Sequence, residues 1–328
     1  MLSLIWLIFA PLIAAGIILF PKFPNHQVKV RRFAKSFAAL HFIYSLLFLL
    51  FFDTGMYGMS FEKELTFFGM TWLKSLGISA KFAVDGVALL MVILTSFVVL
   101  ITLVVSKIHI RSKHKLYYSM VFLFEAALLG IFCAKDMFLF FVFWELSLIP
   151  LYFLVSQWGN SEARAAAMRF TLGSFAANML MFFAMLILYY YNFAVSNVMT
   201  ANIESLSMDE KIYPLWFQIM VFSGFLAAFA IRVPFAFLHS WFPDIQSKAA
   251  APVNILISGI LLGTGVYGLI RFNMLIFPSI FRIFAPVLMV WGVVNLFYAG
   301  ALAIAQSEIK KIVSYANIAS SGFVMLGL

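Results

Sequence analysis

The sequence predicts an all-α, polytopic membrane protein with about ten transmembrane helices. Two observations carry this prediction. Hydrophobic residues make up 64% of the 328 residues, charged residues only 11%, and the mean hydropathy is +1.04; soluble globular domains contain about 25% charged residues. In addition, apolar runs of about the 20 residues that cross a bilayer as a helix recur along the whole chain.

The apolar runs define the predicted helices in order. They cover residues 2–20, 36–52, 83–106, 117–134, 137–156, 168–191, 213–231, 250–270, 279–304 and 309–328. No basic residue precedes the first run and no small-residue cleavage site follows it, so we expect a retained helix and not a signal peptide. Between the second and third runs, the stretch TFFGMTWLKSLGISAKF predicts a hairpin or an interfacial segment.

The distribution of basic residues predicts the orientation in the membrane. When the loops are assigned alternately to two faces, the face that holds VKVRR and HIRSKHK receives twice as many Lys and Arg residues as the other. The positive-inside rule then places these runs inside and the amino terminus outside. The alternative is a patch for anionic lipids or a partner. We therefore interpret the net charge of +9 as a topology signal and expect no nucleic acid partner.

The sequence has no motif that would hold a nucleotide, a haem, an iron–sulfur cluster or a metal ion. It contains no Gly-rich phosphate loop, no CxxC pair and no His, Asp and Glu cluster with metal-ligand spacing. The one cysteine, Cys133, allows no internal disulfide. The five histidines are scattered along the chain: His26, His41, His109, His114 and His239.

Glu145 lies near the middle of the run MFLFFVFWELSLIPLYFLVS at 137–156. An ionised carboxylate at that depth costs several kcal/mol unless it is paired, hydrated or protonated. Pro150 removes a backbone donor five residues further on and can bend the helix. We therefore predict that Glu145 either carries a proton or anchors its helix to a neighbour.

Two further acidic residues fall inside or next to apolar runs. Glu125 and Glu145 each lie about 12 Å from the start of their own run at 1.5 Å per residue, so their depths differ by only several Å. They either share one proton path or face different neighbours. Asp85 opens the run at 83–106, where we predict that it caps the helix.

The seventh run predicts a broken helix. Residues 214–242 are too long for one straight span, and Pro234 follows Arg232 almost at once, before His239 and Pro243. A broken helix exposes backbone groups that must be covered by protein or water, and transporters use such breaks to hold ions. The alternative is a simple kink with Arg232 reaching the membrane surface.

Four segments carry a resemblance to a known family. They read FFVFWELSLIPLYFLVSQWG, ARAAAMRFTLGSFAA, FAIRVPFAFLHSWFPDIQSKAAAPVNILISGILLGTGVYGLIRF and QSEIKKIVSYANIASSGFVMLGL. With LGISAKFAVDGVALLMVILT upstream, they resemble the antiporter-like membrane subunits of respiratory complex I over about residues 75–328. The resemblance is closest to NADH-quinone oxidoreductase subunit M. The superfamily also includes Mrp-type antiporters and the membrane subunits of energy-converting hydrogenases.

The resemblance implies a subunit built from two inverted five-helix repeats, each with a discontinuous helix, of which this chain holds the first. It implies N-terminal helices one to three at 1–116, an antiporter-like core at 117–270 and helices nine and ten at 271–328. In the family a Glu on the fifth helix, matched by Glu145, pairs with a Lys on the seventh. The implied proton-path candidates are Glu145, Glu125, Arg232, His239 and Lys248, with helix breaks at Pro234 and Pro243.

The sequence departs from the family pattern at four places. Arg232 replaces the seventh-helix Lys, Gly263 replaces the eighth-helix Lys, and Ser320 replaces the tenth-helix His. The chain also ends at Leu328, inside the tenth helix, which implies a fragment or a shortened gene product. Arg does not release a proton usefully because its pKa exceeds about 12, so the titratable relay is thinner here than in the family.

We therefore expect a subunit of a proton-translocating NADH-quinone oxidoreductase in a bacterial cytoplasmic membrane. Its partners would be other membrane-arm subunits and the lipid bilayer, and it would supply a proton half-channel or its scaffold. No cofactor is expected on this chain: NADH, FMN, iron–sulfur clusters and quinone would be held by partner subunits. The alternatives are a subunit of an Mrp-type antiporter or energy-converting hydrogenase, and a structural paralogue that does not pump.

Overall fold

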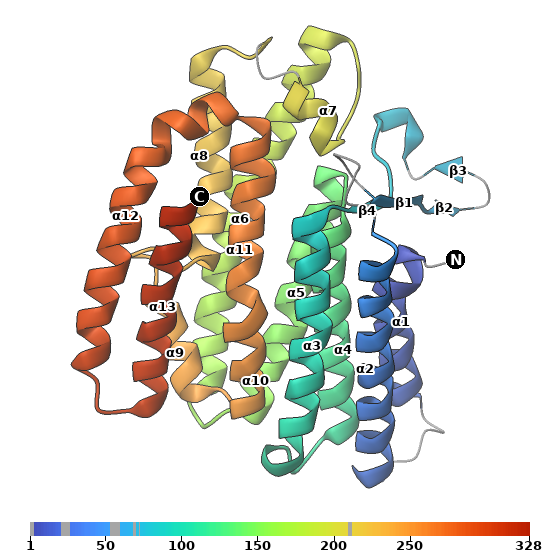
Figure 1. Cartoon of the computed structure of the whole chain (residues 1–328), viewed down its shortest axis with the longest axis vertical. Helices are drawn as coiled ribbons and strands as arrows, with labels where there is room; N and C mark the ends of the chain where they lie inside the picture. Colours follow the sequence, from blue (N-terminus) through green and yellow to red (C-terminus); the bar gives the residue numbers. More distant parts are fainter. Residues whose placement is uncertain (1–2, 21–26, 53–59, 68–69, 72, 209–211) are drawn as a thin grey trace. The chain divides into compact units, whose positions relative to one another are not determined.

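The computed structural model describes residues 3–20, 27–52, 60–67, 70–71, 73–208 and 212–328 (Figure 1). The chain forms two compact units that interleave in sequence. The first unit comprises residues 1–74, 79–160 and 249–260, and the second comprises 75–78, 161–248 and 261–328.

The first unit is built around helix α4. Its helices are α1 (Leu4–Leu19), α2 (Gln27–Leu50), α3 (Gly86–His109), α4 (His114–Cys133), α5 (Met137–Trp158) and α10 (Ala251–Leu256), and α10 leads into a π-helical turn at Ile257–Leu261. Because α1, α2, α3 and α5 all pack on α4, that helix is buried over almost its whole length. α3 also packs on α2 and α10.

Short strands join α2 to α3, where the sequence predicted a hairpin or an interfacial segment. β1 (Ser60–Glu64) pairs antiparallel with β4 (Lys81–Val84), and β2 (Thr66–Phe67) pairs antiparallel with β3 (Met70–Thr71). A 3₁₀ turn at Lys74–Leu76 precedes β4. The hairpin alternative is therefore confirmed for the residues that the structure describes here.

The second unit contains the longest helix and the broken one. Its helices are α6 (Ala163–Ser196), α7 (Ile203–Met208), α8 (Leu215–Arg232), α9 (Trp241–Lys248), α11 (Leu262–Gly268), α12 (Pro278–Ile304) and α13 (Ile309–Gly327), with a π-helical stretch at Leu269–Met274 after α11. α12 packs along α13, and α6 packs along α8. α8 and α11 also lie together.

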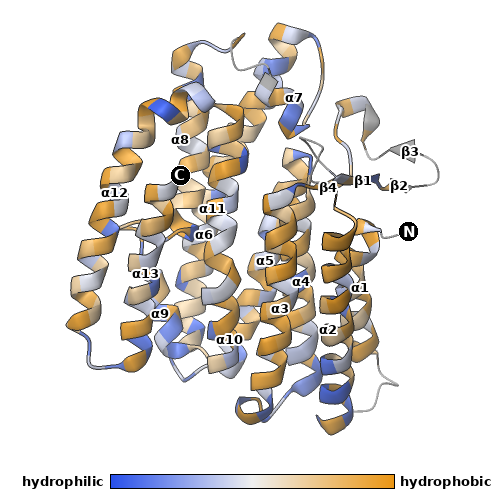
Figure 2. Ribbon diagram, viewed as in Figure 1, coloured by the Kyte–Doolittle hydropathy of each residue, from blue (hydrophilic) through white to orange (hydrophobic). Residues whose placement is uncertain are grey.

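The all-α membrane fold predicted from the sequence is confirmed. In the described part of the chain, eight helices are long and apolar enough to cross a membrane when Ala251–Met274, which includes α10 and α11, is counted as one continuous helix. Figure 2 shows hydrophobic residues along their lengths. α1 is shorter, with 16 residues, and α13 falls outside that set although it has 19 residues. Each of the ten predicted runs nevertheless forms helix.

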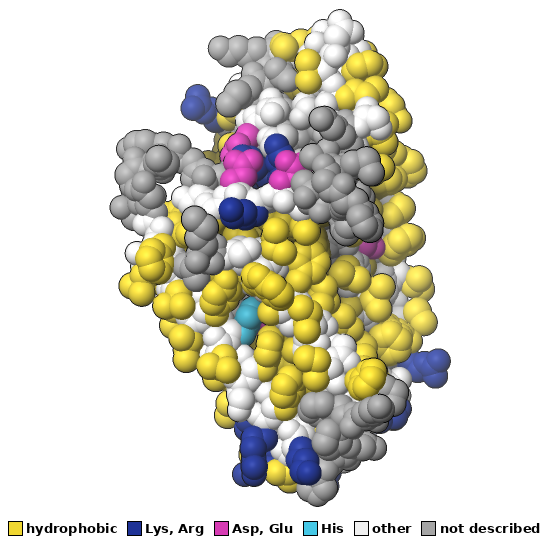
Figure 3. All heavy atoms as spheres, turned by 90° about the vertical axis from the view of Figure 1, so that its right-hand side faces the viewer, with side chains coloured by type: hydrophobic (Ala, Val, Ile, Leu, Met, Phe, Trp, Pro, Cys, Tyr) yellow, Lys and Arg dark blue, Asp and Glu magenta, His cyan; other side chains and the backbone are white. Residues whose placement is uncertain are grey.

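One face of the molecule shows the polarity expected of a membrane protein. In Figure 3 a broad band of hydrophobic side chains lies between a cluster of acidic and basic side chains and the Lys and Arg side chains at the lower end. The strand region contributes ion pairs between Lys135 and Glu62, at 3.4 Å, and between Lys81 and Glu64, at 3.8 Å. Such a band is the surface that a bilayer would cover.

Aspartate side chains cap two helices of the first unit. Asp85 accepts a hydrogen bond from the Ala88 N–H at 2.8 Å, so the predicted cap is confirmed. Asp136 caps α5 by accepting from the N–H groups of Phe138 and Leu139. Pro150 lies inside α5, which continues through it to Trp158.

Candidate functional site

Arg232 is the last residue of α8 and one of the largest fully buried side chains of the protein. Its exposed fraction is 1%, and its Nη1 donates to Oγ1 of Thr264 on α11 at 3.4 Å. A cation in the last turn of a helix also faces the negative end of the helix dipole. The alternative in which Arg232 reaches the membrane surface is therefore wrong.

Glycines on α11 bring it close to the end of α8. A Cβ atom on Gly265 would lie 2.8 Å from Cβ of Arg232 and 2.7 Å from a methyl group of Val233. A Cβ atom on Gly268 would lie 2.3 Å from the ring of Phe229. Only residues without a side chain allow this approach, so the glycines set how closely Arg232 is enclosed.

The chain leaves helical geometry directly after Arg232, as predicted. Pro234 has no N–H to continue the helix, and α9 begins only at Trp241. The N–H groups of Val233 and Phe235 still donate back to Phe229 and Ala230 of α8, at 2.9 and 3.1 Å. The discontinuous helix is thus present, with its break at residues 233–240.

Side chains from other elements bind the backbone groups that the break sets free. Asn295 of α12 accepts from the Ala236 N–H through Oδ1, and its Nδ2 donates to the Pro234 carbonyl at 3.3 Å. Trp291 donates to the Ala236 carbonyl at 3.3 Å. These bonds provide the protein cover that a broken helix needs inside a membrane.

Pro243 does not break a helix. It lies in the first turn of α9, where a backbone N–H has no partner within the helix in any case. Its missing donor therefore costs little at this position. The prediction of a second break at Pro243 is wrong, and the break ends where α9 begins.

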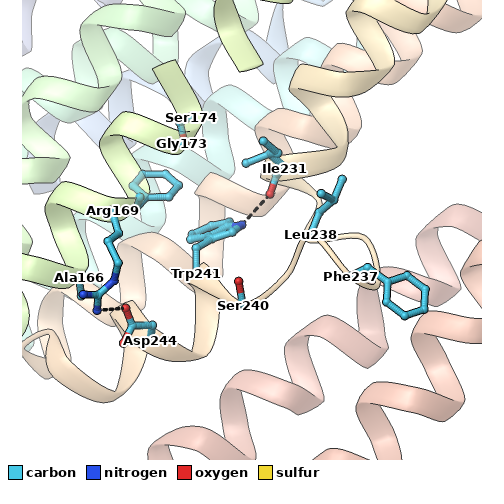
Figure 4. A pocket seen from close by; sticks show the side chains of 11 residues that line it. Ala166, Arg169, Gly173, Ser174, Ile231, Phe237, Leu238, Ser240, Trp241 and Asp244 are labelled. Carbon is cyan, nitrogen blue, oxygen red and sulfur yellow. Dashed lines mark hydrogen bonds and ion pairs between the residues drawn. The ribbon is translucent and has the colours of Figure 1, made fainter. Parts of the chain in front are cut away.

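A pocket of about 580 Å³ lies beside the break (Figure 4). Trp241 donates through Nε1 to the Ile231 carbonyl at 2.9 Å, and its ring packs on Phe170 of α6 with 4.4 Å between centroids. Arg169 of α6 bonds the Asp244 carboxylate at 2.6 Å. The pocket thus has an aromatic side at Trp241 and a neutralised ion pair at one edge.

Lys248, a candidate proton carrier, lies in an ion cluster at the end of α9. Its Nζ is 2.7 Å from Asp244 and 3.1 Å from Glu162. The hydrogen bond to Asp244 and the contact with Glu162 raise the pKa of Lys248. Burial acts to raise the pKa of Asp244, but the hydrogen bonds from Lys248 and Arg169 outweigh it and hold that pKa below its usual range. The cluster keeps Lys248 charged.

The remaining predicted residues are placed as follows. Glu145 lies on α5 in the first unit, half-buried, and its predicted pairing with Arg232 stays a prediction. Gly263 lies on α11. Ser320 is exposed on α13 and donates to the Ala316 carbonyl of its own helix. His239, 7% exposed, lies in the break with its ring edge-on to Tyr298 at 5.4 Å between centroids.

Glu125 is fully buried on α4, and its partner was not predicted. His41 of α2 lies 2.9 Å from the Glu125 carboxylate, with both side chains buried. The sequence signal was present, because His41 falls inside the apolar run at 36–52. Among the described residues, no three His, Cys, Asp or Glu side chains are grouped as they would be around a metal ion.

The fold and the hydrogen-bonded break define the class of this protein. It is a polytopic, helical membrane protein with a discontinuous helix, whose first segment α8 ends at the buried cation Arg232. Residues 134–328 match the family described as NADH:quinone oxidoreductase/Mrp antiporter, TM. The chain therefore belongs to that family, and the resemblance seen in the sequence is confirmed at this level.

Individual relatives agree with this membership. The chain is 35% identical to NAD(P)H-quinone oxidoreductase chain 4 2 of Thermosynechococcus vestitus over 97% of this chain and 57% of the relative. The chain spans about half the length of the curated relatives it matches.

Solved structures share the fold. A chain of respiratory complex I from Thermus thermophilus matches with a TM-score of 0.85 at 22% identity, over 99% of this chain and 64% of that one. A chain of the Mrp complex from Dietzia sp. matches with a TM-score of 0.83 at 19% identity, over 99% of this chain and 58% of that one. The fold is therefore common to both branches of the family.

Proposed function

We propose that this protein is a membrane-arm subunit of a proton-translocating NADH-quinone oxidoreductase of the complex I type. The observation that carries the proposal is the likeness to a relative named NAD(P)H-quinone oxidoreductase chain 4 over 97% of the chain. Other subunits would hold NADH, FMN, the iron–sulfur clusters and quinone. The chain would supply a proton half-channel or its scaffold.

The geometry around Arg232 favours the scaffold role for the broken helix. A relay lysine works because its pKa can move into the working range, whereas a guanidinium stays protonated. Arg232 is enclosed by α11 and bonded to Thr264. Gly263 on α11 has no side chain to receive a proton. We infer that the relay at this break conducts protons poorly and that Arg232 acts as a fixed charge.

The main alternative is an Mrp-type cation/proton antiporter or an energy-converting hydrogenase. The family description covers both quinone oxidoreductases and Mrp antiporters, and the fold likeness to the Mrp complex is almost as close. The antiporter differs from the proposed oxidoreductase in its partners, because an antiporter needs no redox subunits. The composition of the native assembly therefore separates them.

The test is to purify the tagged chain from its native membrane in a mild detergent. We expect it to be isolated with subunits that bind flavin and iron–sulfur clusters, in an assembly that oxidises NADH or NADPH with a quinone acceptor. A purified assembly of membrane subunits alone, with no flavin or iron–sulfur signal, would contradict the proposal and favour the antiporter.

A further inference from the structure

His41 and Glu125 form a buried pair in the first unit that the broken helix does not involve. Nδ1 of His41 lies 2.9 Å from Oε1 of Glu125, and the side chains are 3% and 1% exposed. The imidazole also stacks on Phe37, one turn earlier on α2, with 5.7 Å between ring centroids. The ring is therefore held in one orientation.

The second ring nitrogen is held by a carbonyl that a proline leaves free. Nε2 of His41 lies 2.9 Å from the carbonyl oxygen of Leu7 on α1. In an α-helix that oxygen would accept from the N–H of residue 11, but residue 11 is Pro11, inside α1, and has no N–H. The side chain of His41 takes the place of the missing backbone donor.

This arrangement determines where the protons lie. A carbonyl oxygen can only accept, so Nε2 of His41 must carry a hydrogen. The contact between Nδ1 and Oε1 then needs one proton, either on the carboxyl group or on the imidazole. In both cases the pair is neutral as a whole and holds one shared proton, which avoids a net charge in a buried position.

One atom of the pair remains for exchange. Oε2 of Glu125 is buried, and no residue that the structure describes gives it a hydrogen-bond partner. The other three polar atoms are already engaged with each other or with Leu7. A proton that enters or leaves the pair therefore does so at Oε2.

The helices packed on this pair add few other titratable groups. α1 contains none, and α2 contributes Lys35 and Tyr44 beyond its basic first turns. α3 has Lys107 and His109 in its last turn, and α4 has Tyr117, Tyr118 and the buried Cys133 beyond its first residues. The Tyr44 hydroxyl is bonded to the Ser3 backbone, and Tyr118 receives a bond from Ser106. Glu145 and Tyr152 belong to α5, which packs on α4.

We propose that His41 and Glu125 form a proton-storage site in the first unit, in which one proton stays shared between Nδ1 and Oε1 and a second is bound and released at Oε2. The second proton comes from water and raises the charge of the pair from zero to +1; its release to water restores the neutral pair. The site lies within one unit of this chain, so it does not depend on the assembly proposed above.

Infrared difference spectroscopy of the full chain in lipid vesicles tests the site. Between neutral and acid pH, the natural chain should gain the C=O stretching band of a protonated carboxylic acid. Glu125→Gln should remove the part of this band that belongs to Glu125, while the contributions of other carboxyl groups such as Asp136 remain. In His41→Gln the Glu125 part of the band should no longer follow the pH profile of the natural chain, because Nδ1 is no longer present to share the proton with Oε1. The matched control His239→Gln should leave the difference band unchanged.

A second measurement on the natural chain guards against variants that fail to fold. In ¹⁵N NMR spectra of histidine-labelled protein, Nε2 of His41 should stay protonated at every pH, because the Leu7 carbonyl holds its hydrogen. Two results would overturn the proposal: an Nε2 of His41 that loses its proton, or a carboxyl band whose titration is the same in His41→Gln as in the natural chain. A pair that never changes its protonation would be a structural cross-link only.

Discussion

Asn295 is the residue on which the geometry of the break depends most directly. It is fully buried on α12, and it also donates to Ser321 of α13 at 3.1 Å. We expect Asn295→Ala to leave the Ala236 N–H and the Pro234 carbonyl without partners, at a cost of about 1–3 kcal/mol. The melting temperature in detergent should fall. Hydrogen exchange at the Ala236 amide should accelerate while amides in the middle of α8 remain protected.

Ser320→Ala is a suitable control for Asn295→Ala. Ser320 lies on the neighbouring helix α13, is exposed, and bonds only the carbonyl of Ala316 among its described partners. Its loss should change the melting temperature little. Equal exchange rates at Ala236 in the natural chain and in Asn295→Ala would mean that Asn295 does not hold the break.

Asp136 gives the first unit a predictable dependence on pH. Burial raises the pKa of its carboxyl group from 3.8 to about 6, against the bonds from the N–H groups of Ser79, Leu139 and Phe138, which act to lower it. Between these two values the folded state binds more protons than the unfolded one, so stability falls as the pH rises through this window. The total change is at most about 3 kcal/mol.

We expect Asp136→Asn to remove this part of the pH dependence. The difference in melting temperature between the natural chain and Asp136→Asn should change as the pH rises from 3.8 to about 6 and stay constant above it. The matched control is Asp85→Asn, which alters the other aspartate cap of the first unit and is measured over the same pH range. If Asp136→Asn and the natural chain gave parallel profiles, Asp136 would not be the titrating group.

At the scale of elements, the close contact of α8 and α11 depends on glycine. A methyl group on Gly265 would meet Cβ of Arg232 and the backbone of Val233, neither of which can move without shifting the end of α8. Gly265→Ala should therefore destabilise the protein by about 1–3 kcal/mol through overpacking. Gly300→Ala on α12 meets no atom within 4 Å and should stabilise it by about 1 kcal/mol. The two melting temperatures should shift in opposite directions.

The helices and the break followed from local patterns, whereas the contacts of buried polar residues did not. Apolar runs predicted the long helices because a span must satisfy its own backbone within one segment, whereas the short helices α7 and α9 lie outside the runs. Pro234 predicted the break because it lacks a donor. The partner of Glu125 is 84 residues away in sequence, and that of Ala236 is 59 residues away. No periodicity encodes such pairs, since they depend on which helices become neighbours. The burial of Arg232 was undecided for the same reason.

For the whole molecule, the orientation in the membrane is a testable prediction. In a Cys133→Ala background, Ser112→Cys should react with an impermeant thiol reagent only from the inner face, and Ser207→Cys only from the outer face, because the positive-inside rule predicts that the basic loops lie inside. Cys133 is fully buried, so the natural chain, which keeps this cysteine, should also react little. Labelling of Ser112→Cys from outside would reverse the assignment.

The last prediction concerns the protons that the proposed complex would move. Arg232 cannot hand on a proton, and Gly263 offers no group to receive one. If these two residues limit the relay, Arg232→Lys combined with Gly263→Lys should raise the number of protons taken up into vesicles per electron pair.

Glu145→Gln should then lower that number strongly in the lysine-containing variant and only weakly in the natural chain, because Glu145 has a mobile proton to act on only when a lysine is present. Electron transfer to quinone, measured with an uncoupler, serves as the control for assembly. A loss of a proportionate share of pumped protons on Glu145→Gln in the natural chain would show an active relay, carried past Arg232 and Gly263 by a chain of water molecules.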